Sequence, residues 1–168
     1  MRILLIDDNA KNRAGAKDLL GDKHKLVILD TYVEARDMLT SGQRFDVVLV
    51  DLMLPVVPAV GMNLSLEAVE KYHGQEMPLG LTLAFLALKL GYKKVGIVTN
   101  TNHHDHPMSA ALDILSGMDG SKVTPFGIGD ARIVFCNIPV RKNFEIKCKA
   151  WLPVLKALQT NKSVPVGK

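Results

Sequence analysis

The sequence predicts an α/β fold in which a five-stranded parallel sheet carries helices on both faces, as in doubly wound proteins. Short runs that are apolar throughout alternate with segments in which apolar residues recur three and four positions apart. Strands without polar alternation are expected where helices cover both faces of a sheet. The expected strands are residues 3–6, 26–29, 47–50, 95–98 and 133–135, and the expected helices are residues 11–20, 32–39, 81–90, 109–115 and 147–158.

Length and composition exclude several classes of protein. The chain has 168 residues, enough for one domain that buries roughly 70% of its unfolded surface. Its 48% hydrophobic and 23% charged residues are typical of a folded domain rather than a disordered chain. No apolar run approaches the length that crosses a bilayer, and the first run is too short for a signal peptide. We therefore expect a cytoplasmic protein with reduced cysteines, Cys136 and Cys148, and no membrane partner.

The net charge of +4 is uneven, because the segment from Arg141 onward holds seven Lys or Arg against the single Glu145. This end is a candidate contact surface for an acidic partner, and a solvated helix face with a basic tail is the simpler interpretation. Phe144 and Trp151 are the two aromatic residues among these charges, too few to favour a nucleic-acid partner.

Three stretches fall outside the alternating plan. Residues 55–78 are rich in Pro and Gly and hold one helical pattern at 65–72, with Asn63 or Ser65 as its N-cap. Residues 117–130 are glycine-rich and predict an extended loop. We expect one domain over residues 1–158, with an insertion at about 56–79, followed by a mobile tail over residues 159–168.

Three acids follow the first and third strands. Asp7 and Asp8 close the first strand and Asp51 closes the third, and these strands are neighbours in this topology. Carboxylates about 4 Å apart repel one another by roughly 4 kcal/mol at an effective dielectric near 20, so the cluster must hold protons or a cation. Oxygen ligands in a small site favour Mg²⁺.

The segments that carry these acids resemble the receiver domains of two-component response regulators. The similar segments are LLIDDN at residues 4–9, FDVVLVDLMLP at residues 45–55 and VGIVTN at residues 95–100, the second being the most specific. The resemblance implies a flavodoxin-like sheet in the order 2-1-3-4-5. It also implies a histidine kinase or phosphotransfer protein and a downstream protein as partners, and leaves a homodimer open.

The resemblance implies a role for each matching residue at the acidic site. Asp51 matches the phosphoacceptor, whose carboxylate attacks a phosphohistidine or a small phosphodonor. Asp7 and Asp8 match the acids that hold Mg²⁺ together with Asp51, and the backbone carbonyl of Met53 matches the position that completes the metal site. Thr99 matches the hydroxyl residue that bonds the phosphoryl group.

Two further positions bear on switching. Phe135 matches the aromatic residue whose rotation accompanies the movement of the Thr99 loop. Receivers carry a Lys-Pro pair after the fifth strand, where this chain has Ile138-Pro139. The residues that could replace the lysine by reaching back are Asn137, Arg141 and Lys142.

After the missing lysine, the insertion is the second departure from the family pattern. If Gly80 replaces the glycine that opens helix three of receivers, about twenty residues are added beside the acidic site. They could form a lid, or an added helix that packs on the domain edge or makes an oligomer contact.

The third departure is the histidine cluster of TNTNHHDHP at residues 99–107. His103, His104 and His106 with Asp105 are candidate ligands for Zn²⁺ or Ni²⁺, or groups that tune the site near neutral pH. The alternative is the polar start of a helix, with Asp105 or His106 near the N-cap and Pro107 at the first helical position.

The leading functional hypothesis is an atypical stand-alone receiver that is phosphorylated on Asp51 with Mg²⁺ and so switches a protein-interaction surface. The only catalysis expected of such a protein is its own phosphorylation from a phosphodonor; otherwise it is a signalling protein. The alternative is an interaction module that works without phosphorylation. A third hypothesis is a metal-dependent hydrolase or phosphatase that uses the aspartates and the histidine loop.

Overall fold

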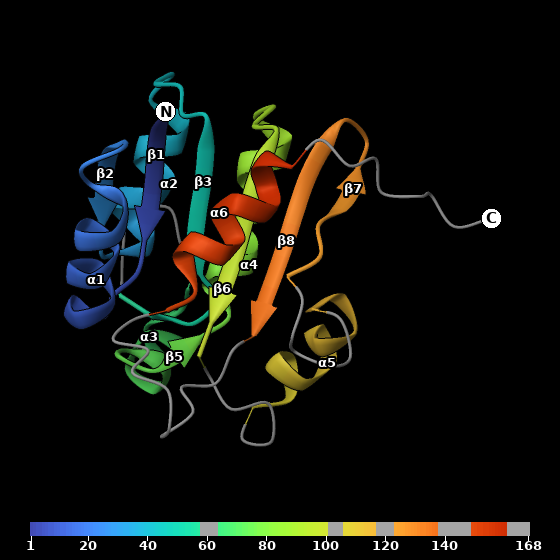
Figure 1. Ribbon diagram of the computed structural model, residues 1–168. Coiled ribbons are helices and arrows are strands. Elements are labelled where there is room, and N and C mark those ends of the chain that lie inside the picture. Colours follow the sequence, from blue (N-terminus) through green and yellow to red (C-terminus); the bar gives the residue numbers. More distant parts are fainter. Residues whose placement is uncertain (58–63, 101–105, 117–122, 138–148, 161–168) are drawn as a thin grey trace.

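The computed structural model describes residues 1–57, 64–100, 106–116, 123–137 and 149–160 (Figure 1). In chain order the elements are β1 (Arg2–Ile6), α1 (Ala10–Leu20), β2 (Lys25–Leu29), α2 (Tyr32–Thr40), β3 (Val47–Asp51), β4 (Leu54–Pro55), α3 (Leu66–Tyr72), β5 (Glu76–Met77), α4 (Leu79–Lys89), β6 (Lys94–Thr99), α5 (Pro107–Ser116), β7 (Phe126–Ile128), β8 (Ala131–Asn137) and α6 (Trp151–Gln159).

The main sheet has the order β2-β1-β3-β6-β8-β7. Its first five strands are parallel, which confirms the predicted sheet and its 2-1-3-4-5 order. The sixth strand, β7, lies in the stretch predicted to be a loop and pairs antiparallel with β8. Gly129 turns the chain between them at a φ of +59°, a conformation that glycine adopts without strain. A run of only three residues was too short to predict this edge strand.

Helices cover both faces of the sheet (Figure 1). On one face α1 and α6 pack over a core that includes Leu5, Leu49 and Trp151. On the other face α2 and α4 pack over a second core built from the alternate side chains of the same strands. Because the central strands contribute apolar residues to both cores, they contain no polar alternation.

Glycine allows α6 to approach the sheet closely. A Cβ atom placed on Gly96 of β6 would lie 2.5 Å from a methyl carbon of Val154 in α6. The helix begins at Trp151 rather than near residue 147 as predicted. Its Pro153 therefore falls in the first turn, where the missing N–H group costs no helical hydrogen bond. Residues 147 and 148 lie outside the described residues.

Part of the predicted insertion forms a small ribbon and helix beside the main sheet. The strands β4 and β5 pair antiparallel, and α3 lies between them in the sequence. Ser65 caps α3 by accepting a hydrogen bond from the backbone N–H of Ala68 at 3.1 Å. Asn63, the other predicted cap, lies outside the described residues. The division of the chain into domain, insertion and tail stays a prediction.

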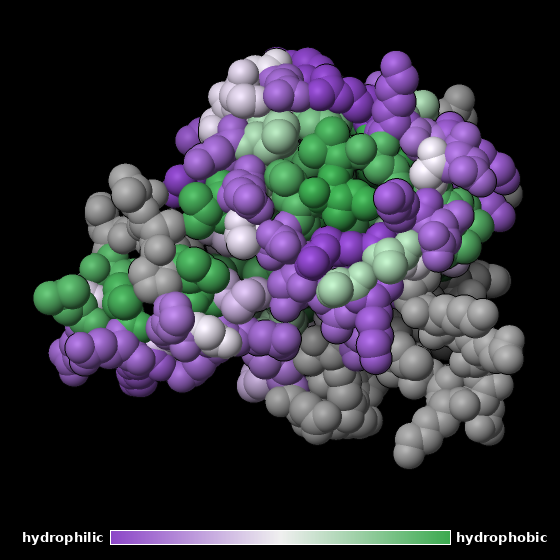
Figure 2. All heavy atoms as spheres, turned by 90° about the vertical axis from the view of Figure 1, so that its left-hand side faces the viewer, coloured by the Kyte–Doolittle hydropathy of each residue, from purple (hydrophilic) through white to green (hydrophobic). Residues whose placement is uncertain are grey.

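At the β2 edge of the sheet, Figure 2 shows hydrophobic side chains in a patch surrounded by hydrophilic ones. Within the described ranges this strand pairs with β1 alone, and residues 26–29 are each partly exposed. Among the described helices, none combines the length and the apolar character needed to cross a membrane.

Candidate functional site

The acidic residues meet at the carboxyl ends of β1 and β3. One carboxylate oxygen from each of Asp7, Asp8 and Asp51 lies within 4.8 Å of the others. Asp7 and Asp51 are buried, and Asp8 is partly exposed. The two strands are hydrogen-bonded neighbours, so the residues that end them are brought to one point of the sheet edge. Hard oxygen donors at this spacing suit a small divalent cation such as Mg²⁺.

The start of α1 holds Asp7 in place. One oxygen of Asp7 accepts hydrogen bonds from the backbone N–H of Asn9 at 2.8 Å and from the side-chain amide of Asn12 at 3.3 Å. The guanidinium of Arg13 donates to the backbone carbonyls of Asp7 and Asp8. Asn9 also caps α1, so the turn that ends β1 and the helix that follows it are fixed by the same residues.

A lysine enters the acidic cluster from the other end of the chain. The ammonium of Lys149 lies 2.9 Å from Oδ2 of Asp7 and pairs with Oδ2 of Asp51. Its side chain is 1% exposed. From the sequence, the residues expected to replace the missing lysine by reaching back were Asn137, Arg141 and Lys142. The structure instead places Lys149 in the pocket, while Arg141 and Lys142 lie outside the described residues.

Nothing in the sequence marked Lys149 as part of the acidic site. It lies 98 residues after Asp51 and outside any motif, two positions before Trp151. The placement follows from α6, which packs Trp151 into the core and so brings the residues just before it to the carboxyl ends of β1 and β3. Only the packed fold shows that this lysine and the aspartates are neighbours.

Burial and charge shift the protonation of the cluster. Burial raises the pKa of Asp51 to about 7, against the opposing effect of the nearby Lys149 ammonium. Burial and the neighbouring Asp7 raise the pKa of Asp8. With all three acids ionised, the three carboxylates and one ammonium carry a formal charge of −2. One divalent cation would neutralise this charge, so the residues fit a Mg²⁺ ion.

The backbone after Asp51 is shaped by a close contact with α4. Oδ1 of Asp51 accepts a hydrogen bond from the backbone N–H of Met53 at 3.2 Å. Gly80, the second residue of α4, donates its N–H to the carbonyl of Leu52 at 3.0 Å. A Cβ atom at Gly80 would lie only 1.7 Å from the carbonyl oxygen of Asp51, so no other residue fits this contact. The proposed metal contact of the Met53 carbonyl stays a prediction.

No family model and no curated protein matches the sequence. The structure is similar to a response regulator receiver protein from Sinorhizobium medicae, with 17% identity, coverage of 86% and 83% of the two chains and a TM-score of 0.48. It is also similar to the N-terminal domain of a response regulator/sensory box/GGDEF protein from Carboxydothermus hydrogenoformans, with 16% identity, coverage of 61% and 66% and a TM-score of 0.44.

A third similar structure is the non-phosphorylated HemR receiver domain from Leptospira biflexa. It is 19% identical, and the alignment covers 97% of this chain and 98% of that one with a TM-score of 0.52. The chain has the receiver-domain fold. In this receiver fold β6, α5, β8 and α6 are the fourth and fifth strand–helix units, and β7 is an addition at the edge.

The two residues matched to the receiver switch are both buried. Thr99 is the last residue of β6 and follows Val98, the register partner of Asp51. Phe135 of β8 lies opposite Ile97 of β6 and is 1% exposed. The structure therefore places Thr99 beside the acidic pocket and Phe135 in the core on the α4 side of the sheet. Their roles in switching stay predictions.

The histidine loop is only partly described. His103 and His104 lie outside the described residues, so their metal-binding role stays a prediction. His106 lies just before α5, and its Nδ1 atom is buried without a hydrogen-bond partner among the described residues. Pro107 is the first residue of α5, which favours the interpretation that this segment starts a helix.

Asn137, considered above as a replacement for the missing lysine, contacts α5 instead. Its side-chain amide donates to the hydroxyl of Ser109 at 3.1 Å and to the carboxylate of Asp113 at 3.0 Å. Both partners belong to α5, and Ser109 is fully buried. Asn137 therefore ties α5 to the carboxyl end of β8, and no contact with the acidic cluster is found for it among the described residues.

The raised pKa of Asp51 predicts a specific pH dependence of stability without added metal. The pKa of the Asp51 carboxyl is about 3.9 in the unfolded chain and about 7 in the folded chain. Between these two pH values the folded chain therefore binds more protons than the unfolded chain. The free energy of unfolding of the wild type should therefore fall relative to that of Asp51→Asn as the pH rises from about 4 to about 7. Urea unfolding of both proteins in EDTA measures this, and parallel pH profiles would contradict it.

Removing Lys149 should leave two buried carboxylates without their shared counter-ion. We expect Lys149→Met to lower the free energy of unfolding at pH 8 by about 3–5 kcal/mol. The loss should shrink below about pH 6, because Asp51 then takes up a proton. The control is Lys93→Met, which removes an exposed pair with Asp130 and should have a small effect at either pH. Equal stability of Lys149→Met and the wild type at pH 8 would refute this role.

Proposed function

We propose that this protein is an atypical response regulator receiver, phosphorylated on Asp51 with Mg²⁺ bound beside it, that switches a protein-interaction surface. One observation carries the proposal: a cluster of three aspartates, two of them buried, at the carboxyl ends of β1 and β3 that already contains a lysine ammonium. A receiver fold with this cluster has the groups that aspartyl phosphorylation needs.

In this proposal Asp7, Asp8 and Asp51 hold the Mg²⁺ ion, together with the carbonyl of Met53. The metal supplies positive charge against the negative charge that develops on the transferred phosphoryl group. Asp8 is the most accessible of the three acids. Asp7 is held at the start of α1 by hydrogen bonds from Asn9 and Asn12.

Asp51 is the nucleophile. A carboxylate oxygen of Asp51 forms a bond to phosphorus, while the bond from phosphorus to the nitrogen or oxygen of the donor breaks and its electron pair leaves with the donor. The product is an acyl phosphate. Asp51 must be ionised to attack, and burial raises its pKa to about 7 in the metal-free chain, so a bound Mg²⁺ ion would also favour the reactive, ionised form at neutral pH.

Lys149 and Thr99 act on the phosphoryl group after transfer. Lys149 contacts Oδ2 of Asp51, so its ammonium is placed to donate a charge-assisted hydrogen bond to a phosphoryl group bonded to this carboxylate. The hydroxyl of Thr99, at the end of the neighbouring strand, is a hydrogen-bonding group for a phosphoryl oxygen. A shift of Lys149 would be passed to α6, which begins two residues later, and a shift of Thr99 would be passed along the chain that leads to α5. The partners we propose are a histidine kinase or phosphotransfer protein, as donor, and a downstream protein.

A second candidate is a receiver-like interaction module that works without phosphorylation. It is favoured by Lys149, whose ammonium already compensates Asp7 and Asp51 in the absence of a phosphoryl group. Such a module would bind its partner equally well as wild type and as Asp51→Asn, whereas a phosphorylation-driven receiver would not. The hydrolase hypothesis rests on His103 and His104, which lie outside the described residues.

Phosphotransfer from a small donor tests the proposal. Incubation with acetyl phosphate and Mg²⁺ should add one phosphoryl group to the wild type, detected by intact-mass spectrometry, and none to Asp51→Asn. The matched control is Asp37→Asn, which changes an aspartate on the exposed side of α2 and should label like the wild type. EDTA should abolish labelling. A wild type that stays unlabelled, or an Asp51→Asn variant that is labelled, would overturn the proposal.

A further inference from the structure

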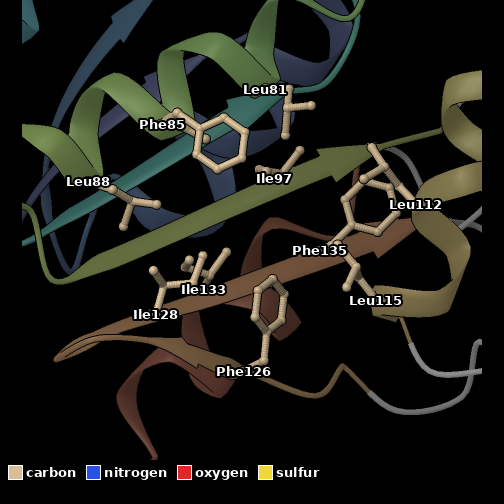
Figure 3. Close-up of a pocket in the computed structure, with 11 residues that line it drawn as sticks. Leu81, Phe85, Leu88, Ile97, Leu112, Leu115, Phe126, Ile128, Ile133 and Phe135 are labelled. Carbon is tan, nitrogen blue, oxygen red and sulfur yellow. The ribbon is translucent and has the colours of Figure 1, made fainter.

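A cavity of about 140 Å³ lies on the α4 side of the sheet, away from the acidic cluster. It is bounded by α4, β6, β8, β7 and α5, and Figure 3 shows their side chains converging on it. Ile97, Ile133 and Phe135 are nearly fully buried and form its floor. Phe85, Leu115 and Ile128 are 55%, 38% and 48% exposed and border its mouth.

The position of α5 accounts for this cavity. Asn137 ties α5 to the carboxyl end of β8 through Ser109 and Asp113. In Figure 1 this helix lies beside that end of β8, apart from α4. The sheet between the two helices is therefore covered by neither, and its side chains line a hollow.

The chemistry of the lining limits what can occupy the cavity. All 11 lining side chains are hydrocarbon, and the strands beneath them hydrogen-bond to one another. A stable buried water needs two to four polar partners, which these side chains do not supply. A charged or strongly polar ligand would lose its hydration without gaining a hydrogen bond. The occupant must be uncharged and apolar.

The volume limits the size of the occupant. Pockets for drug-sized ligands and cofactors usually measure about 300–1,000 Å³, so nucleotides and flavins are too large for this cavity. A dry cavity of about 150 Å³ lined by Leu, Ile and Phe is known to bind benzene or xenon. We infer that this cavity is a binding site for a small uncharged aromatic or branched aliphatic molecule, about the size of benzene or toluene.

The cavity lies next to the switch elements. Phe135 in the cavity floor lies two residues before Asn137, the end of β8. Ile97, also in the floor, lies two residues before Thr99, the end of β6. A ligand bound there packs between α4 and α5 and stabilises the arrangement of α5 described above. Binding itself does not depend on phosphorylation of Asp51, so it is tested separately.

Titration of the ¹⁵N-labelled full chain with benzene, followed by NMR, tests the inference. The wild type should show saturable shifts of amides in β6, β8 and α4. Ala84, which is 2% exposed and lines the cavity, is replaced in Ala84→Leu to fill it. This variant should bind benzene at least tenfold more weakly. The matched control is Ala14→Leu, the same change at an exposed position of α1, and it should bind like the wild type.

A second variant guards against misfolding of the first. Leu112→Ala removes part of the α5 wall and should bind naphthalene more tightly than the wild type does. Shifts that do not saturate, or equal benzene affinities of wild type and Ala84→Leu, would overturn the inference. It would also be overturned if the wild type dimerises on concentration through the same residues and Ala84→Leu prevents this, because the hollow would then be an interface between copies.

Discussion

The ammonium of Lys149 between Asp7 and Asp51 is the contact on which the arrangement of the site depends. The parallel sheet forces the acids together, because β1 and β3 are neighbours, Asp7 and Asp8 follow β1 directly, and Asp51 ends β3. Three carboxylates at this spacing would repel one another strongly if all were ionised and uncompensated. Lys149 lowers that repulsion and at the same time joins the start of α6 to the site. The remaining formal charge of −2 suits one divalent cation, so the same four side chains can serve the metal-free and the metal-bound protein.

Much of this fold could be predicted from the sequence, for a physical reason. Strands such as β3 are buried on both faces and therefore apolar at every position, which distinguishes them from the amphipathic helices between them. The aspartates could be predicted to meet because the chain order sets where parallel strands end. Lys149 could not, because its neighbours are set by how α6 packs through Trp151, and that contact joins residues far apart in sequence. The edge strand β7 was missed because three residues carry too little periodicity.

The polar and apolar contacts of α5 connect the acidic site with the opposite side of the sheet. Asn137 holds this helix at the end of β8, next to Thr99 in the neighbouring strand. The helix in turn forms one wall of the apolar cavity whose floor includes Phe135. A change at the carboxyl ends of β6 and β8 and a change in the cavity would therefore act on the same helix. If both changes shift this helix, the two sites are coupled in both directions.

The central claim is that Asp7, Asp8 and Asp51 form one metal site with Lys149 as its internal cation. The single tryptophan, Trp151, reports on it directly, because its ring centre lies 5.9 Å from the Lys149 ammonium. We predict that titration with Mg²⁺ changes the tryptophan fluorescence saturably, with one ion per chain by calorimetry and at least tenfold weaker binding in Asp8→Asn. A wild type that shows neither a fluorescence change nor heat of binding up to millimolar Mg²⁺ would contradict the account.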